Sequence, residues 1–235
     1  MFSPKLAILP PAQRQLWPEL ASLPDHLVLY GDTAIALRLG HRTSVDFDFF
    51  TDVDLDGDEK DRLLKIAWLK DADVLQNDED TFTVSVETGA GAVKLSFFGD
   101  LKCGRIGEPD RTDDAVVCVA SLEDLLAHKL KVVHDRAAGR DYQDIAAILT
   151  SGQDLARALA GARALFGPAL PAMIMVKALT YFEDVTEPWR LTDEVKAALV
   201  AATANLPERL DPAPVISTTL RCDLTSRPST PLRIR

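Results

Sequence analysis

Two acidic side chains one residue apart are the first feature of this sequence that could do chemistry. Asp46 and Asp48 lie in the stretch GHRTSVDFDFF, residues 40–50. Alternate side chains of a strand share a face, so both carboxylates point the same way. The apolar residues of the other face are expected to pack: Val45, Phe47 and Phe49. Paired carboxylates resist burial unless a cation neutralises them, which predicts a Mg²⁺ or Mn²⁺ site. The alternative is an edge strand whose acids face water.

Groups that bind phosphate precede the two acids. In LYGDTAIALRLG, Gly31 stands between a predicted strand and the start of a helix, where free N–H groups and the helix dipole favour an anion. Thr33 offers a hydroxyl at the same turn, and Arg42 and Ser44 follow shortly after it. A glycine at such a turn is weak evidence by itself. Together with the acids, these residues predict phosphate-binding groups beside a metal site.

A lysine on an apolar helix face is the second unusual feature. Lys129 falls inside a stripe with helical spacing, and Arg136 and Arg140 continue along the same face. The stripe consists of Leu122, Leu125, Leu126, Val132 and Val133. An inward lysine requires an anionic partner or a phosphate group. The alternative is that its long side chain reaches a nearby edge of the protein.

Two further acids share an apolar helix face. Asp141 and Asp144 align at helical spacing with Ile145, Ile148 and Leu149, so both are expected to point inward. Acidic and basic groups on inward faces favour a site over an ordinary surface. The four histidines show no spacing typical of metal ligands, and we expect them to be incidental: His26, His41, His128 and His134.

The elements that must position these residues can be read from the first half of the chain. Its patterns predict strands at 26–31 and 44–50, and a short helix between them at 32–40. That helix is capped by Asp32 or Thr33 and ended by Gly40. A helix at 56–72 and an antiparallel hairpin of strands 81–87 and 92–99 follow.

From Ser121 onward the pattern becomes helical. A long helix is expected to break near Gly139, with further helices at 153–166, 170–184 and 192–204. We therefore predict an α+β fold, with a mixed β-sheet and flanking helices at the N-terminus and a helical domain after it. The predicted divisions are an α/β domain at 1–120, a helical domain at 121–205 and an extended tail rich in proline and arginine at 206–235.

Composition limits the class of protein. The 235 residues are 47% hydrophobic, as in a globular chain, and the formal net charge of −10 argues against a broad basic face for nucleic acid. A local basic groove remains compatible with that charge. No apolar run is long enough to span a bilayer, so no membrane partner is expected. Three widely spaced cysteines suggest neither a disulfide framework nor a zinc site, and the expected location is the cytoplasm.

The combination of motifs resembles a known family. GDTAIALRLGHRTSVDFDFF, followed about 80 residues later by EDLLAHKLKVVHDRAAGRDYQDIAAIL, is similar to the nucleotidyltransferase superfamily. Within it, the chain most resembles the AbiEii/AbiGii toxins of type IV toxin–antitoxin systems. The resemblance covers about residues 26–150. It implies a nucleotidyltransferase-like α/β domain that uses a nucleoside triphosphate and Mg²⁺ or Mn²⁺.

The resemblance also implies a role for each matching residue. Catalytic residues would be Asp46, Asp48, Lys129 and Asp144, with Asp46 and Asp48 as the metal ligands. Gly31 and Thr33 would form the turn around the phosphates. The other nucleotide-binding residues would be Arg42, Ser44, Arg140 and Asp141.

At two positions the chain differs from the family pattern. Asp32 stands where the family has a second glycine, and its charge is expected to weaken triphosphate binding. Ser96 stands where many nucleotidyltransferases have a third acid. Glu87, on the neighbouring strand, is a candidate replacement.

The function expected from the resemblance is metal-dependent nucleotidyl transfer to RNA, protein or a small acceptor. tRNA or a protein would be the acceptor of a toxin, and a cognate antitoxin would be its partner. Two alternatives stay open. One is a degenerate nucleotidyltransferase fold that binds a nucleotide or a partner without catalysis, and the other is a transferase that modifies small molecules of the antibiotic type.

Overall fold

A single mixed β-sheet forms one side of the protein. The computed structural model describes residues 1–185 and 191–222. Within them, the strands are β1 (Val28–Tyr30), β2 (Phe47–Phe50), β3 (Asp73–Asn77), β4 (Thr81–Thr88), β5 (Gly91–Phe98), β6 (Asp110–Arg111) and β7 (Cys118–Val119). Their order is β3-β4-β5-β2-β1-β7-β6. The pairs β1–β7 and β2–β5 are parallel and the others are antiparallel.

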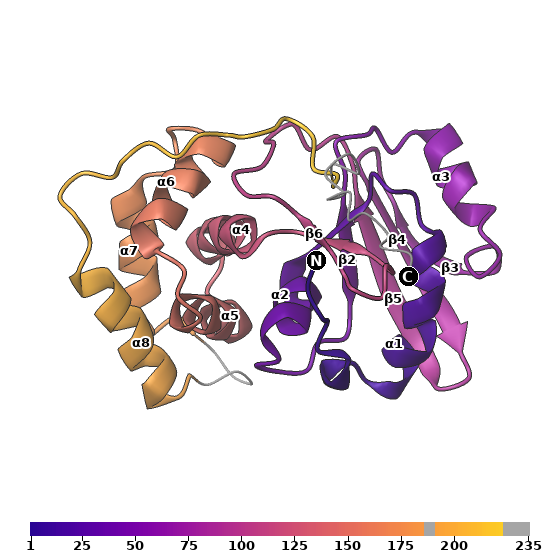
Figure 1. The fold of residues 1–235 in the computed structure, drawn as a ribbon, viewed down its shortest axis with the longest axis horizontal. Coiled ribbons are helices and arrows are strands. Elements are labelled where there is room, and N and C mark those ends of the chain that lie inside the picture. Colours follow the sequence, from indigo (N-terminus) through magenta and orange to yellow (C-terminus); the bar gives the residue numbers. More distant parts are fainter. Residues whose placement is uncertain (186–190, 223–235) are drawn as a thin grey trace, which may run out of the picture.

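Helices surround this sheet and continue beyond it. They are the α-helices α1 (Pro11–Leu16), α2 (Gly31–Leu39), α3 (Gly57–Leu64), α4 (Leu122–Asp135), α5 (Gly139–Thr150), α6 (Leu155–Phe166), α7 (Ala172–Thr180) and α8 (Asp193–Ala204), with 3₁₀ turns at Leu6–Ile8 and Trp17–Ser22. Figure 1 shows α4 to α8 gathered at one end of the molecule, with α2 between them and the sheet. The predicted α+β class with a mixed sheet is confirmed. The predicted domain boundaries stay a prediction.

The alternation of side chains along β2 places Asp48 on the face opposite Phe47 and Phe49, as the sequence predicts. Phe47 and Phe49 are buried in the core, where Phe49 stacks on Phe97 with ring centroids 5.7 Å apart. Asp48 lies on the opposite face. The strand is shorter than expected, however, because it begins only at Phe47. Val45 lies outside it and is 44% exposed, so the prediction that Val45 packs with the phenylalanines is wrong.

The turn into α2 also differs in detail from the prediction. Tyr30 is the N-cap and Gly31 opens the helix, so neither Asp32 nor Thr33 caps it. Gly40 ends the helix in the left-handed conformation, with φ +72°, as predicted. The helix expected at 56–72 ends as an α-helix at Leu64, and the exposed strand β3 was not predicted.

The other predicted elements are present. Strands β4 and β5 form the antiparallel hairpin. Ser121 caps α4 by accepting a hydrogen bond from the Asp124 backbone N–H, and the chain breaks between Asp135 and Gly139. The three helices expected at 153–166, 170–184 and 192–204 are α6, α7 and α8.

The segment that follows α8 returns to the sheet, as the yellow part of the ribbon in Figure 1 shows. There, Arg105 exchanges backbone hydrogen bonds with Ile216 and Ser217, each 2.9 Å long. Cys118 of β7 forms a disulfide bond with Cys222, so the prediction of no disulfide was wrong. The two cysteines are 104 residues apart, and so wide a spacing does not indicate that they pair. The rest of the predicted tail, 223–235, lies outside the described residues.

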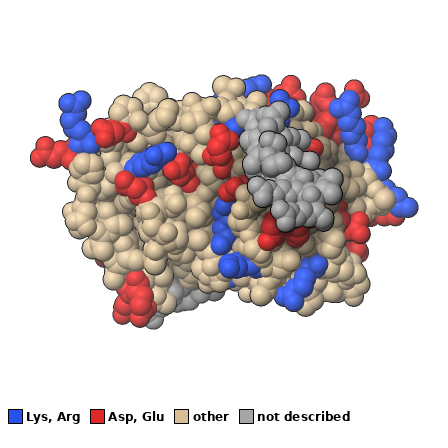
Figure 2. Space-filling view, in the orientation of Figure 1, with Lys and Arg blue, Asp and Glu red and all other residues tan. Residues whose placement is uncertain are grey.

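The surface gives no sign of a broad basic face in the view of Figure 2, where lysine and arginine side chains are scattered among acidic ones. Among the described residues, no helix combines the length and the apolar character needed to cross a bilayer. The predicted cytoplasmic location stays a prediction.

Candidate active site

Gly31 brings the start of α2 against the carboxylate of β2. Tyr30 pairs with Asp48 in the antiparallel register of β1 and β2, so the residue after Tyr30 turns directly over Asp48. Gly31 has φ +69°, and a Cβ added there would lie 2.7 Å from Asp48 Oδ2. A side chain at this position would therefore require both a strained backbone and a displaced carboxylate. Glycine is the residue that permits the close approach.

Asp48 and Asp46 form an acidic pair that the protein only partly neutralises. Burial raises the pKa of Asp48 to about 6, and the charges of Asp46 and Asp32 add to this effect. Ser96, directly opposite on β5, donates a hydrogen bond to Asp48. Asp46 is more exposed and forms an ion pair of 3.1 Å with Lys94. Carboxylates that repel each other and are only partly neutralised suit hard divalent cations such as Mg²⁺ or Mn²⁺.

Thr33 and Ser44 hold the segment that leads to these acids. Their hydroxyl oxygens are 2.7 Å apart, and Thr33 donates a hydrogen bond to the backbone carbonyl of Asp46. Both side chains are buried. They tie α2 to the segment before β2 and so fix the position of Asp46. Their predicted role in binding the nucleotide stays a prediction.

Lys129 lies at the centre of a buried acidic group. Its ammonium is 2.6 Å from Asp141 and 2.8 Å from Asp144, and it also contacts Asp32. Burial alone would lower the pKa of Lys129, but the charges of Asp144, Asp32 and Asp141 outweigh it and raise that pKa above its ordinary value. The prediction that the inward lysine has anionic partners is confirmed.

The three acids around Lys129 have the spacing of a metal site, since one oxygen from each lies within 4.8 Å of the others. The ammonium of Lys129 already supplies a cation to these oxygens. This group therefore differs from the pair formed by Asp46 and Asp48. The chemistry of the donor sets favours the pair, and not the group around Lys129, as the place for a divalent cation.

Arg42 extends this network toward α5. It makes a bidentate contact with Asp144, with Nε 2.7 Å from one oxygen and Nη2 2.8 Å from the other. His41 Nε2 donates a 2.7 Å hydrogen bond to Asp144. Although burial acts in the opposite direction, these hydrogen bonds and the charges of Lys129 and Arg42 hold the pKa of Asp144 well below its usual range. The expectation that His41 is incidental was wrong.

A pocket of about 410 Å³ opens beside the network. Its charged lining residues are Asp32, Asp48, Lys129, Asp135, Arg136 and Asp141. Its apolar and aromatic lining residues are Tyr30, Ile35, Phe50, Phe98, Leu125, His128 and Val132. Tyr30 stacks on Phe50 with ring centroids 4.6 Å apart, and the ring of His128 packs against both. The lining therefore combines charged groups with an aromatic cluster that suits a flat, apolar group.

His128 was also expected to be incidental, which was wrong. Its Nε2 atom is buried without a hydrogen-bond partner. Burial, with a smaller effect from the Lys131 charge, lowers the pKa of His128 to about 4, so the ring is neutral near pH 7. The sequence signal that could have found it is its place one residue before Lys129, on the turn of α4 that faces β1.

The structure thus brings most of the predicted site residues into one region. Gly31, Asp48, Lys129 and Asp141 line the pocket, whereas Arg42, Asp46 and Asp144 stand behind or beside it. Arg140 lies in the first turn of α5 and is not among the described residues that line the pocket. Its predicted nucleotide-binding role, like the catalytic roles of the other residues, stays a prediction.

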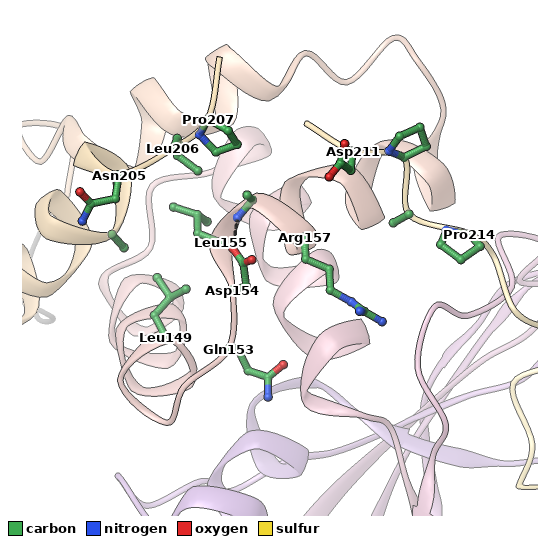
Figure 3. A pocket seen from close by; sticks show the side chains of 14 residues that line it. Leu149, Gln153, Asp154, Leu155, Arg157, Asn205, Leu206, Pro207, Asp211 and Pro214 are labelled. Atoms are coloured by element: carbon green, nitrogen blue, oxygen red, sulfur yellow. Dashed lines mark hydrogen bonds between the residues drawn. The ribbon is translucent and has the colours of Figure 1, made fainter. Parts of the chain in front are cut away.

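A larger cavity of about 660 Å³ lies elsewhere, between the start of α6 and the segment 205–214 (Figure 3). Two of its charged side chains have local partners. Asp154 caps α6 by accepting a hydrogen bond from the Ala156 N–H, and Arg157 forms an ion pair with Glu123. The acids and bases that the sequence singled out are not part of its lining.

The chain is similar to known proteins in sequence and in fold. An uncharacterized protein of Aquifex aeolicus (strain VF5) is 27% identical over 184 residues, which is 74% of this chain and 84% of that protein. The solved structure of MenT4, a nucleotidyltransferase toxin from Mycobacterium tuberculosis H37Rv, is similar with a TM-score of 0.55 and 17% identity. The similarity covers 82% of this chain and 81% of MenT4, and it shows a shared fold.

The chain also matches a family model, described as the nucleotidyl transferase AbiEii toxin of the type IV toxin–antitoxin system. The match spans residues 16–172, and so includes Gly31, Asp46, Asp48 and the network around Lys129. The resemblance seen in the sequence is thereby confirmed. The chain belongs to the AbiEii nucleotidyltransferase toxin family.

Proposed function

We propose that this protein transfers a nucleotidyl group from a nucleoside triphosphate to tRNA, a protein or a small acceptor, in a reaction that depends on Mg²⁺ or Mn²⁺. The observation that carries the proposal is the acidic pair Asp46 and Asp48, of which Asp48 lies against the Gly31 turn and lines the pocket. A divalent cation, when bound, would neutralise the triphosphate and stabilise charge on the leaving pyrophosphate.

The residues of the chain would act mainly by positioning and by charge. Asp46 and Asp48 would hold the cation, while Gly31 keeps the start of α2 close to Asp48. Lys129 would face the phosphates, with Asp141 and Asp144 fixing its position. Arg42 would hold Asp144 in place through its bidentate contact. Such a site requires no covalent nucleophile from the protein.

The aromatic residues of the pocket lining would give the base of the nucleotide a surface to contact. Phe50, Phe98 and His128 line the pocket together with the charged groups. Stacking on such side chains is compatible with any base, because every base has a flat π-face. Transfer of label from each nucleoside triphosphate in turn identifies the nucleotide.

The test is transfer of label from α-³²P nucleoside triphosphates, each in turn, to tRNA, to proteins and to small acceptors in the presence of Mg²⁺ or Mn²⁺. We expect transfer by the unaltered protein and a loss to background in Asp46→Asn and Asp48→Asn. Asp58→Asn, an exposed acid in the first turn of α3, is the matched control and should retain full transfer. Full transfer by Asp48→Asn would contradict the proposal.

We further propose that the activity is that of a toxin opposed by a cognate antitoxin, as the description of the family suggests. Expression in a bacterial host should arrest growth, and Asp48→Asn should relieve the arrest. Co-expression of the neighbouring gene of a two-gene system should also relieve it. Arrest of equal strength by Asp48→Asn would argue against toxicity through nucleotidyl transfer.

A second candidate function is nucleotide binding without catalysis. The observation that favours it is Ser96, which faces Asp48 where many nucleotidyltransferases have a third acid. In this case the protein would bind a triphosphate with Mg²⁺ but transfer no label to any acceptor. Transfer that disappears in Asp48→Asn would exclude this candidate.

A further inference from the structure

Asp32 has an unusual place among the charged groups of the pocket. It lies in the first turn of α2, next to Gly31, and its two carboxylate oxygens contact different cations. One oxygen accepts from Lys129, and the other lies 2.8 Å from Arg42 Nη2. Two cations at the start of a helix form an arrangement that suits a phosphate group. Asp32 fills this arrangement with an anion of the protein itself.

The three acids of the network are not equivalent. The side chains of Asp141 and Asp144 are 1% and 0% exposed, whereas that of Asp32 is 26% exposed and lines the pocket. Without Asp32, Lys129 would still contact two carboxylates, and Arg42 would keep its bidentate contact with Asp144. The two buried acids therefore fix the cations, and Asp32 is the member that a ligand from the pocket can replace.

The balance of charge leads to the same conclusion. Lys129, Arg42 and Arg136 bring three positive charges to the network, and Asp141 and Asp144 bring two negative charges. Asp32 completes the neutralisation. If it moved away, the network would have one positive charge to offer to an anion in the pocket.

We propose that the carboxylate of Asp32 occupies the position of a phosphate group, and that a triphosphate binds by displacing it from Lys129 and Arg42. This inference rests on the proposed function, since it takes the pocket to be a triphosphate site. Asp32 thus sets the affinity of the pocket, and it holds the network in a closed, self-neutralised state when no nucleotide is bound.

The test measures binding of inorganic tripolyphosphate with Mg²⁺ by calorimetry, because this probe has phosphate groups but no base. We expect Asp32→Asn and Asp32→Gly to bind it about tenfold more tightly than the unaltered protein, since a competing charge is gone. Asp135→Asn is the charge-matched control. Asp135 also lines the pocket, but its ion pair is with Lys131, so its loss releases neither Lys129 nor Arg42. We expect its affinity to change by less than about threefold.

Equal or weaker binding by both Asp32 variants would overturn the inference, as would an equal gain in Asp135→Asn. Thermal melting of each variant checks that it is folded, and Asp32→Gly provides a second measurement if Asp32→Asn is unstable. The proposed function is judged separately, by transfer of label. Tighter tripolyphosphate binding by the Asp32 variants without any transfer of label would support the role of Asp32 and contradict the proposed activity. Transfer of label without tighter binding by these variants would support the activity and contradict the role of Asp32.

Discussion

The two acidic groups of this protein lie side by side but are neutralised to very different degrees. Around Lys129, each carboxylate contacts at least one cation of the chain, and the pKa of Asp144 is held low. At the start of β2, Asp46 pairs with a partly exposed lysine, and the half-buried Asp48 has a raised pKa. The first group stabilises the fold by internal pairing. The second stores an unfavourable charge that a cation from solution would relieve.

The largest effect is expected from breaking the neutralised group. Asp144→Ala leaves Arg42 and Lys129 with buried charges and fewer partners, and should lower the free energy of unfolding by about 3–5 kcal/mol. Urea denaturation measures this change. Asp135→Ala, which removes an exposed ion pair with Lys131, should cost less than about 1 kcal/mol. A cost below about 1 kcal/mol for Asp144→Ala would show that the network contributes little.

The next effect concerns the group that is not neutralised. The pKa of Asp48 is about 6 in the folded protein against 3.8 for the ordinary carboxyl, so the folded state holds this proton more tightly. The protonated Asp48 carboxyl therefore makes its full contribution to folding stability below pH 4, and this contribution is lost as the pH rises to 6. The loss should be about 1–3 kcal/mol.

Asp48→Asn removes this loss, so in metal-free buffer its stability relative to the unaltered protein should rise between pH 4 and pH 6. Above pH 6, added Mg²⁺ should stabilise the unaltered protein but not the variant. Urea titrations at several pH values, with and without Mg²⁺, measure both effects. A difference between the two proteins that does not change with pH would contradict the raised pKa.

The smallest effect comes from the glycine that stands between the two groups. Gly31→Ala places a side chain at φ +69° and against Asp48, and should cost about 1–2 kcal/mol of stability. Gly57→Ala is the matched control, because a Cβ there meets nothing within 4 Å and its backbone needs no glycine. Thermal melting compares the two. Equal melting temperatures would show that the turn tolerates a side chain.

Much of this contrast could be predicted from sequence where a pattern is local. The period of two placed Asp48 opposite Phe47 and Phe49, and the helical period placed Lys129 on an inward face. The contact of Lys129 with Asp32 of α2 could not be predicted, because Asp32 is 97 residues away and only the packing of α4 against α2 brings the two together. A pattern of spacing within one element contains no such information.

Other errors have the same origin. Strands β6 and β7 have two residues each, too few for any periodicity to appear. The spacing of the histidines from one another contains no information on their contacts with other elements, where His41 bonds to Asp144 and His128 packs against Tyr30. Membership of the family could be inferred because its motifs lie within short stretches of sequence.

The disulfide bond has a consequence for the topology of the whole chain. Cys118 and Cys222 are 104 residues apart in the sequence, and α4 to α8 all lie between them. The helical part is thus a closed covalent ring that leaves the sheet after β7 and rejoins it at the same strand. In the chain-entropy view, such a ring restricts the unfolded chain and contributes about 4–5 kcal/mol to stability. Helix α4, which forms one wall of the pocket, therefore lies in a segment that is covalently attached to β7 at both ends, and not in a domain joined to the sheet by a single linker.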